Sequence, residues 1–436
     1  MRRFVKNRVL EYIEDLQKQH KLLETAFLEN NTEEISMLSA ECQEKAIVVG
    51  NTIEAEGASH EAAVKKLESY CETLYRQSMG LEEFTRQKLD DCISDARDYV
   101  NNQIPEELEI VFFPYKASMW DSLESVWMAA MEDAASTAYV VPIPYFDKNP
   151  DGTVSAMHYE GDAFPEYVPV VHWKDYDVKT RHPDVIYIHN PYDHGNKVTT
   201  VHLDFYAKEL KKYTDLLVYI PYFVCVDDAV PEHLCVLPGT LYADRVIVQS
   251  EKARDIYIRE FQKFEEEYGC KGKFGNPEEK FLALGSPKFD AVFRAMNEEI
   301  QLPKDWHNKI VRADGSRKKV LLYNTSVSQL LAGKEELLKK IKDVFAYMKN
   351  RDDMALLWRP HPLSETTCEA MRPELLNAYD AIVKTYQEEN WGIYDDTPDL
   401  HRAIAVSDAY YGDMSSLVEL YRVTGKPVMI QNVDVI

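Results

Sequence analysis

The sequence is short of glycine and of positive charge. Glycine makes up 16 of the 436 residues, and the motifs G-x-x-x-x-G-K-[ST], G-x-G-x-x-G and G-x-S-x-G are all absent. Walker-type ATPases, dinucleotide-dependent dehydrogenases and α/β-hydrolases build their sites on those turns, so none of these classes is favoured. With 50 Lys and Arg against 74 Asp and Glu, the net charge is −24. A surface of this sign repels nucleic-acid backbones, and no nucleic-acid partner is expected.

Paired cysteines and long apolar runs are missing as well. The seven cysteines are scattered and no C-x-x-C occurs, which disfavours a disulfide framework and a zinc ribbon. Acidic residues interrupt the segment after Met1, so neither a signal peptide nor a transmembrane helix is predicted there. Reduced thiols fit a cytoplasmic protein, and a peripheral contact with the inner face of the cell membrane stays open.

Residues 1–104 are predicted to form a separate helical module. Apolar residues recur at helical, heptad-like spacing in three segments, the first of which begins with Val5, Val9 and Tyr12. This pattern predicts a helical hairpin or a short coiled coil, whose apolar stripes would need a partner surface. The expected role is oligomerisation, docking or membrane apposition, with a homo-oligomer formed through these helices as one outcome.

Short apolar runs alternate with helical segments from Pro105 onward. Such alternation predicts mostly parallel, doubly wound sheets. A polar stretch at residues 296–319 is expected to link a first Rossmann-type domain (105–300) to a second (301–436). The predicted fold class is therefore α/β: an all-α module followed by two doubly wound domains with a cleft between them.

The most informative stretch lies near the end of the second domain. A strand at residues 409–411 runs through a Gly-Asp-Met-Ser-Ser turn, which includes Asp413, into a helix. Backbone N–H groups and the hydroxyls of Ser415 and Ser416 gather there, at the carboxyl end of a strand, where α/β proteins usually hold a phosphate. Ser416 and Glu419 also fit S-x-x-E, so a local capping box is the alternative.

Two other strand ends in the second domain carry polar groups. Arg359 offers a planar, permanent cation that suits a phosphate, and His361 is held between two prolines. Asn324 and Thr325 end the first strand of that domain, where amide and hydroxyl groups bind phosphate or ribose. The alternatives are that Arg359 pairs with a carboxylate and that residues 323–326 cap the next helix.

The first domain has its own candidates. Lys116, Ser118 and Asp121 follow its first strand, where the first two could meet an anion and Asp121 could cap a helix. His189 follows another strand, and an imidazole suits a general base near neutral pH. The spacing of His189 and His194 is not a marked zinc spacing, so no metal ion is expected.

With these pieces in order, residues 182–432 resemble the CDP-glycerol:poly(glycerophosphate) glycerophosphotransferases of teichoic-acid synthesis. That family has a GT-B-like pair of Rossmann-type domains. The resemblance is carried, in matching order and spacing, by ADRVIVQS (243–250), LGSPKFD (284–290), WRPHP (358–362), YDDTPD (394–399) and SDAYYGDMSS (407–416), with Lys426 and Pro427 closing. No counterpart is found for residues 1–104. The residues after Ile430 are too few for the helix that commonly closes GT-B folds, so a second domain truncated at its C-terminus is one expectation.

The resemblance implies an enzyme that transfers glycerophosphate, or a similar polyol phosphate, from a CDP-linked donor to an acceptor hydroxyl. CMP would be released, in cell-wall or surface polymer synthesis. Arg359, His361 and the Ser415–Ser416 turn would hold the donor diphosphate, and His189 would be the base. The acceptor would be a polyol phosphate or a glycan lipid, and neither cofactor nor metal is required. Where the family reads His-Gly-Thr-Pro, this chain reads His-Asn-Pro-Tyr from His189, so loop shape and acceptor are expected to differ.

Two other functions fit the same sequence. A GT-B glycosyltransferase or epimerase that uses a sugar nucleotide would share the fold, and Glu419 is placed where many such enzymes hold a ribose. A non-catalytic binding protein that acts through its N-terminal helices is the third candidate. Nucleotide preference separates the first two, and loss of a phenotype on mutating His361 would argue against the third.

Overall fold

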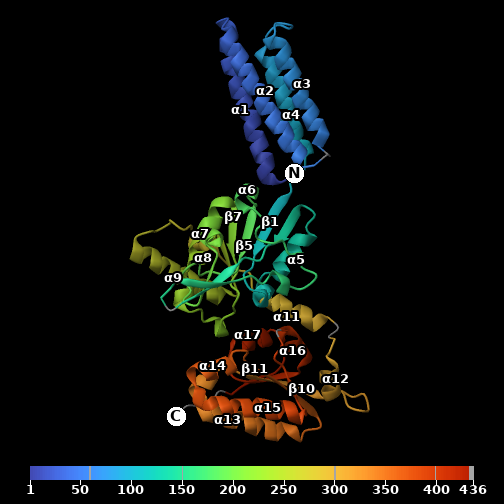
Figure 1. Ribbon diagram of the computed structural model, residues 1–436, viewed down its shortest axis with the longest axis vertical. Helices are drawn as coiled ribbons and strands as arrows, with labels where there is room; N and C mark the ends of the chain where they lie inside the picture. The colour runs from blue at the N-terminus through green and yellow to red at the C-terminus, as the bar shows by residue number, and fades with distance from the viewer. Residues whose placement is uncertain (58–59, 150, 299–300, 398, 432–436) are drawn as a thin grey trace.

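The computed structural model describes residues 1–57, 60–149, 151–298, 301–397 and 399–431. Three bodies follow one another along the long axis of the molecule: a helical bundle, a first sheet domain and a second sheet domain (Figure 1). The first sheet domain lies between the other two, so it is the body that contacts both. None of the helices in these ranges combines the length and apolar character needed to cross a membrane.

Four antiparallel helices form the bundle: α1 (Arg3–Leu28), α2 (Thr32–Ala55), α3 (Glu61–Ser78) and α4 (Arg86–Gln103). Each helix packs on the next, and α4 returns to pack on α1. The heptad-spaced residues, among them Val9, Ile13 and Leu16, are fully buried at its centre. The third helical segment is divided near Gly80, which has φ +66° and was a possible break in the sequence. The prediction that the apolar stripes need a partner surface is wrong, because they face one another within the bundle.

Ion pairs fasten the base of the bundle to the first sheet domain. Arg2 binds Glu56, which directly follows α2, at 2.8 Å and reaches Glu109 of the first strand at 3.4 Å. Arg3 binds Asp184 at 2.9 Å. Both carboxylates on the sheet domain are buried, so the surrounding protein screens these pairs much less than water would. These ion pairs therefore fix the orientation of the bundle relative to the first sheet domain.

The first sheet domain is built on a six-stranded parallel sheet with the order β2-β1-β5-β7-β8-β9. Helices cover both faces, and apolar side chains fill the space beneath them on each side. The apolar runs predicted as strands overlap all six. The strands are β1 (Leu108–Phe113), β2 (Ser136–Val140), β5 (Val185–Ile188), β7 (Leu216–Tyr219), β8 (Arg245–Val248) and β9 (Phe281–Ala283), and the helices are α5 (Glu124–Glu132), α6 (Val178–Arg181), α7 (Ala207–Leu210), α8 (Pro238–Tyr242), α9 (Glu251–Tyr268) and α10 (Pro277–Lys280).

A small antiparallel sheet beside the parallel one was not predicted. It has the order β4-β3-β6, with strands β3 (Tyr145–Lys148), β4 (Val154–His158) and β6 (Thr199–Val201). Most of β4 is exposed, so its sequence lacks the alternation of buried and exposed residues that marks a strand.

The second sheet domain has five parallel strands in the order β12-β11-β10-β13-β14. One face carries α13 and α15, and the other carries α16 and α17, so the sheet is doubly wound. The predicted architecture, a GT-B-like pair of Rossmann-type domains behind an all-α module, is confirmed. The elements are β10 (Lys319–Thr325), β11 (Met354–Pro360), β12 (Ile393–Tyr394), β13 (Ala409–Gly412), β14 (Val428–Ile430), α13 (Val327–Lys349), α14 (Ser364–Met371), α15 (Pro373–Glu389), α16 (Leu400–Val406) and α17 (Ser416–Arg422), with α11 (Pro287–Asn297) and α12 (Lys304–Ile310) in the connection between the domains.

Candidate functional site

The order of strands reverses at β10 in the second sheet domain. From β10 the chain winds through β11 to β12 on one side, then through β13 to β14 on the other. At such a switch point the helices leave the sheet on opposite faces, and the crevice between the strand ends is where open α/β sheets bind ligands. The crevice here lies between the ends of β10 and β13, where Asn324 pairs with Gly412.

The side chain of Asn324 connects the strand ends that border this crevice. Its side chain is buried, and its Nδ2 donates to the backbone carbonyl of Arg359 at 2.9 Å. Its Oδ1 accepts from the hydroxyls of Ser415 and Tyr410, each at 3.2 Å. Thr325 is also buried, and its hydroxyl accepts from the indole N–H of Trp358 at 3.2 Å. Both side chains are engaged with the protein, and the prediction that Asn324 and Thr325 bind the donor directly stays a prediction.

Asp413 is an internal anion of the crevice. Its side chain has no exposed surface, and its carboxylate accepts from the backbone N–H of Ser326 at 2.7 Å and from Lys340 Nζ at 3.1 Å. A buried carboxylate with these partners holds β10 and β13 together. Its predicted role as a donor ligand is wrong, since the side chain is enclosed and its charge would repel a phosphate.

Arg359 is committed to a buried ion pair. Its guanidinium binds the carboxylate of Asp395, which has no exposed surface, and donates to the carbonyl oxygen of Thr397 at 2.7 Å. The alternative predicted from sequence, pairing with a carboxylate, is therefore the correct one. Arg359 thereby fixes the loop after β12, and its role as a phosphate ligand stays a prediction.

Two serine hydroxyls and one imidazole remain at the open side of the crevice. Ser415 precedes α17 and donates to Asn324, while Ser416 is exposed. His361, at the end of β11, donates its backbone N–H to the Thr325 carbonyl oxygen at 2.9 Å. Strands two apart in a sheet are about 10 Å from each other, so His361 and Ser415 can contact one diphosphate-sized group from two sides.

The ring of His361 is held in one tautomer. Its Nδ1 accepts the backbone N–H of Leu363 at 3.1 Å, so the hydrogen of the neutral ring sits on Nε2. Partial burial lowers the pKa of His361 below its usual value. The residue is nevertheless exposed. At neutral pH it therefore has an uncharged Nε2–H that is available as a donor to a ligand.

His189, the predicted base, is enclosed at the end of β5. Its Nε2 accepts the backbone N–H of Tyr115 at 3.0 Å, and its Nδ1 lies 2.9 Å from the hydroxyl of Ser122. That hydroxyl donates to the Met119 carbonyl oxygen at 2.7 Å, so His189 Nδ1 carries the hydrogen. The side chain has no exposed surface, and burial lowers its pKa to about 3. With both nitrogens engaged, His189 cannot take a proton from an acceptor, and its predicted role is wrong.

This burial predicts that the protein loses stability in acid. His189 stays neutral in the folded chain down to about pH 3, whereas the unfolded chain takes up a proton near pH 6.5. The contribution of neutral His189 to the free energy of unfolding is therefore complete above pH 6.5. It falls by about 1.4 kcal/mol per pH unit as the pH drops from 6.5 toward 3. Urea unfolding at pH 7 and pH 5 should show a smaller pH-dependent loss for His189→Gln than for the wild type. Equal losses would contradict the assignment.

Asp121 links the two sheet domains. Its carboxylate binds Lys288 of α11 at 2.6 Å and lies 3.4 Å from Nε2 of His401 in α16. The Lys288 ammonium and the hydrogen bond with His401 hold the pKa of Asp121 below its usual value despite its burial. Asp121 was predicted on the acceptor side, and its partners correct that role to a bridge between domains. Ser118, three residues earlier, is exposed, and its predicted contact with the acceptor stays a prediction.

No protein-family model and no curated protein sequence matches this chain. Among solved structures, the UDP-GlcNAc 2-epimerase from Neisseria meningitidis bound to UDP-GlcNAc aligns with 74% of this chain and 82% of its own, at 10% identity and a TM-score of 0.44. The wall teichoic acid polymerase TagF aligns with 85% of this chain and 79% of its own, at 13% identity and a TM-score of 0.41. These similarities are partial, and the roles of the residues are inferred from the geometry of this chain alone.

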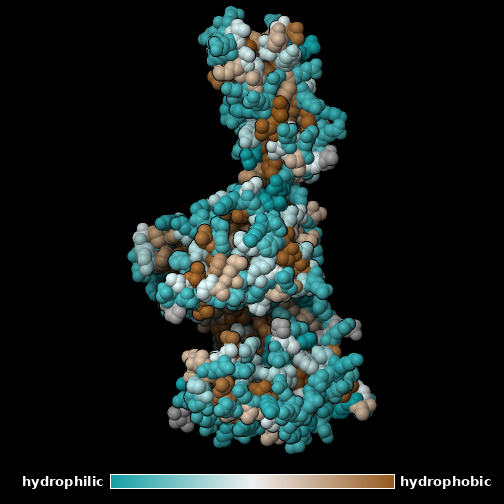
Figure 2. All heavy atoms as spheres, in the orientation of Figure 1, coloured by the Kyte–Doolittle hydropathy of each residue, from teal (hydrophilic) through white to brown (hydrophobic). Residues whose placement is uncertain are grey.

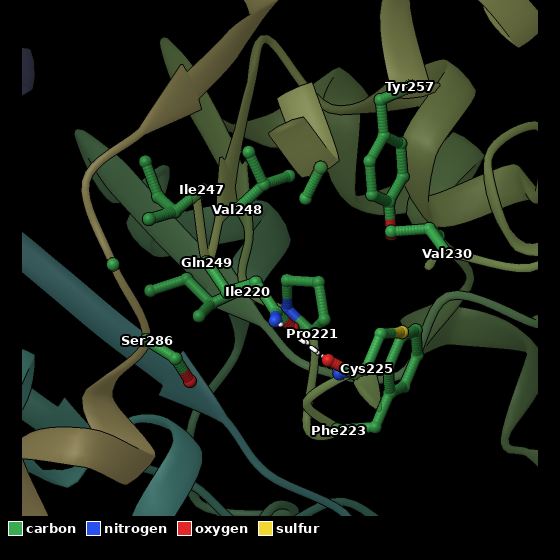
Figure 3. A pocket seen from close by; sticks show the side chains of 12 residues that line it. Ile220, Pro221, Phe223, Cys225, Val230, Ile247, Val248, Gln249, Tyr257 and Ser286 are labelled. Atoms are coloured by element: carbon green, nitrogen blue, oxygen red, sulfur yellow. Dashed lines mark hydrogen bonds between the residues drawn. The ribbon is translucent and has the colours of Figure 1, made fainter. Parts of the chain in front are cut away.

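A loop after β7 in the first sheet domain was not singled out from the sequence. Gln249, at the end of β8, bonds to both backbone groups of Cys225, at 2.7 and 2.9 Å (Figure 3), and to the carboxylate of Asp228 at 2.6 Å. Apolar side chains, including Ile220 and Phe223, line a small pocket around it. The only sequence signal for Gln249 was its place in the 243–250 stretch.

This loop carries Asp227 to the second sheet domain. The backbone N–H of Asp227 donates to Glu419 of α17 at 3.2 Å, and its carboxylate binds Arg422 at 2.6 Å. Glu419 therefore faces the first domain and does not fold back on Ser416, so the alternative of a capping box is wrong. One oxygen of the Glu419 carboxylate is occupied by these protein contacts, and its role as a donor ligand stays a prediction. Above the contact, a hollow with hydrophobic residues at its floor separates the two domains (Figure 2).

Proposed function

We propose that this protein transfers glycerophosphate, or a similar polyol phosphate, from a CDP-linked donor to an acceptor hydroxyl and releases CMP. The acceptor would be a polyol phosphate or a glycan lipid of a surface polymer. The cytidine base and the glycerol come from the resemblance carried by residues 243–250, 284–290, 358–362, 394–399 and 407–416. The crevice between the ends of β10 and β13 supports the proposed position of the diphosphate.

The observation that carries the proposal is the crevice between β10 and β13. Its floor is closed by buried, mutually bonded groups, Asn324 above all, while the Nε2–H of His361 and the exposed hydroxyl of Ser416 remain for a ligand. The Ser415 hydroxyl would join them by exchanging its bond to Asn324 for one to the ligand. A diphosphate placed among them would gain hydrogen bonds to a charged acceptor, which are stronger than bonds between neutral groups.

In the proposed reaction the acceptor hydroxyl attacks the phosphorus that bears glycerol. A new phosphorus–oxygen bond forms, the bond to the bridging oxygen breaks, negative charge grows on the leaving CMP, and the proton of the acceptor hydroxyl passes to water. Phosphoryl transfer passes through a loose transition state, so positioning and charge stabilisation supply most of the catalysis. His361 and the serine hydroxyls would stabilise the leaving phosphate, as preorganised donors do. The enclosed His189 has no part in this step.

Calorimetric titration with CDP, CMP and UDP tests the proposal. We expect CDP to bind more tightly than CMP, because CMP lacks the second phosphate, and more tightly than UDP. Release of CMP from CDP-glycerol, CDP-ribitol and UDP-sugars then identifies the donor. Tighter binding of UDP would replace the proposal with a sugar-nucleotide transferase or epimerase. Absence of binding by every nucleotide would favour a non-catalytic protein.

A further inference from the structure

Lys116 of the first sheet domain is a cation without an acidic partner. Its Nζ lies 5.7 Å from the ring centroid of Tyr115 and 5.0 Å from that of Tyr145. Both distances are within the range at which an ammonium is attracted to an aromatic face. Among the residues that the structure describes, no carboxylate lies within ion-pair distance of it. Lys116 is therefore a partly buried lysine without an ion pair in a chain of net charge −24, and its ammonium is available to an anionic ligand.

The carboxylate built into this corner is occupied elsewhere. Glu160 accepts the hydroxyl of Tyr145 at 2.6 Å through one oxygen and the backbone N–H of Ala117 at 2.9 Å through the other. It therefore fixes the ring beneath Lys116 and the residue that follows Lys116. It makes no ion pair with the Lys116 ammonium among the residues that the structure describes, so the ammonium has no carboxylate in direct contact.

The other ring is fixed as firmly. The backbone N–H of Tyr115 donates to His189, and the Tyr115 ring meets the rings of His189 and Tyr145 edge-on, with centroids 5.4 and 5.6 Å apart. Tyr115 is almost completely buried. The two tyrosines thus form a rigid platform, and little ordering of the platform is needed when a ligand binds to the ammonium above it.

The platform stands at the switch point of the first sheet. β1 has β2 on one side and β5 on the other, and the chain winds outward from it in both directions. Lys116 follows β1 by three residues, so it lies at the carboxyl edge where the crevice of a doubly wound sheet opens. The arrangement matches that of the β10–β13 crevice in the second domain.

We propose that Lys116, on the Tyr115–Tyr145 platform, is a binding subsite for the phosphate ester of a second substrate. A lysine ammonium binds phosphate as a point charge, without demanding one orientation of its oxygens. That the second substrate is the acceptor rests on the proposed function, whereas the subsite itself does not. The phosphate could belong to a soluble polyol phosphate or to a lipid head group, which share this chemistry.

Titration of the full chain with sn-glycerol 3-phosphate and with glycerol tests the subsite. We expect the phosphate ester to bind and glycerol not to bind. Lys116→Gln should weaken phosphate binding about ten- to a hundredfold, and Lys116→Arg should keep most of it. Lys273→Gln is the matched control, because its ammonium lies 5.5 Å from the Phe274 ring centroid on another surface. Wild-type protein that does not bind the ester, or equal affinities in both Gln variants, would overturn the proposal.

Two further arms separate the alternatives. Cosedimentation with phosphatidylcholine vesicles, with and without phosphatidic acid, shows whether a lipid-borne phosphate is accepted, and Lys116→Gln must abolish any gain. Titration of Lys116→Gln with CDP should match the wild type, and a joint loss would place Lys116 in the nucleotide site and refute a separate subsite. If CDP fails to bind the wild type while Lys116-dependent ester binding is present, the proposed function fails and the subsite stands.

Discussion

Replacing His361 by alanine is expected to lower CMP release from saturating CDP-glycerol about 10²–10³-fold, the usual cost of one preorganised donor at a developing charge. The ring is set for this role because Leu363 holds its Nδ1, which leaves the hydrogen on Nε2. The loss should be in turnover and, more weakly, in CDP affinity, since the leaving phosphate gains charge during the reaction.

The pH dependence of the same reaction follows from the lowered pKa of His361. The neutral ring, which is the one that keeps the Leu363 bond, persists above the usual value of about 6.5 and is lost only below it. The rate of CMP release, as far as it depends on neutral His361, should therefore be constant from pH 7 to 8. It should fall at acid pH, where the ring takes up a proton. His233→Ala is the matched control, an exposed histidine on the first domain. Unchanged CMP release by His361→Ala, with an unchanged melting temperature, would remove His361 from the reaction.

Gly412→Ala is expected to destabilise the second sheet domain by about 2–6 kcal/mol, from overpacking and backbone strain together. Gly412 has φ +142°, and a Cβ built there would lie 2.1 Å from the carbonyl oxygen of Asn324. Neither strand can move aside, because the Asn324 side chain bonds to Ser415 and to the Arg359 backbone. The crevice should open and CDP binding should be lost with it.

Gly425→Ala separates strain from crowding. Gly425 also has a positive φ, +69°, but nothing lies within 4 Å of a Cβ built there. Its cost should be about 1–2 kcal/mol, with CDP binding retained. Urea unfolding and calorimetry on both variants make the comparison. Equal costs for the two substitutions would show that the close approach of β10 and β13 does not stabilise the domain.

Strand positions and the site edge could be predicted from the sequence, because they depend on local pattern. Apolar runs followed by polar residues gave the ends of β10, β11 and β13, and parallel strands bring such ends to one edge. The orientation of each side chain could not be predicted in the same way. A histidine after a strand looks alike in sequence whether its ring faces a crevice, as at His361, or the interior, as at His189.

Most of the differences between the predicted and the observed site involve side chains whose contact partners are distant in the sequence. Arg359 meets Asp395, 36 residues further on, and Glu419 meets Asp227 on the other domain, 192 residues earlier. No periodicity encodes such pairs. The bundle was misread for a related reason. Heptad spacing shows that an apolar stripe is buried, but not whether the covering helix comes from the same chain.

The bundle also sets the outline of the molecule in solution. A helix of 26 residues, such as α1, is about 39 Å long, and the bundle extends away from the two sheet domains (Figure 1). A rod of that length on two rounded lobes increases hydrodynamic drag beyond that of a sphere of equal mass. Small-angle X-ray scattering should accordingly show a pair-distance distribution with one main peak from the lobes and a long shoulder from the rod.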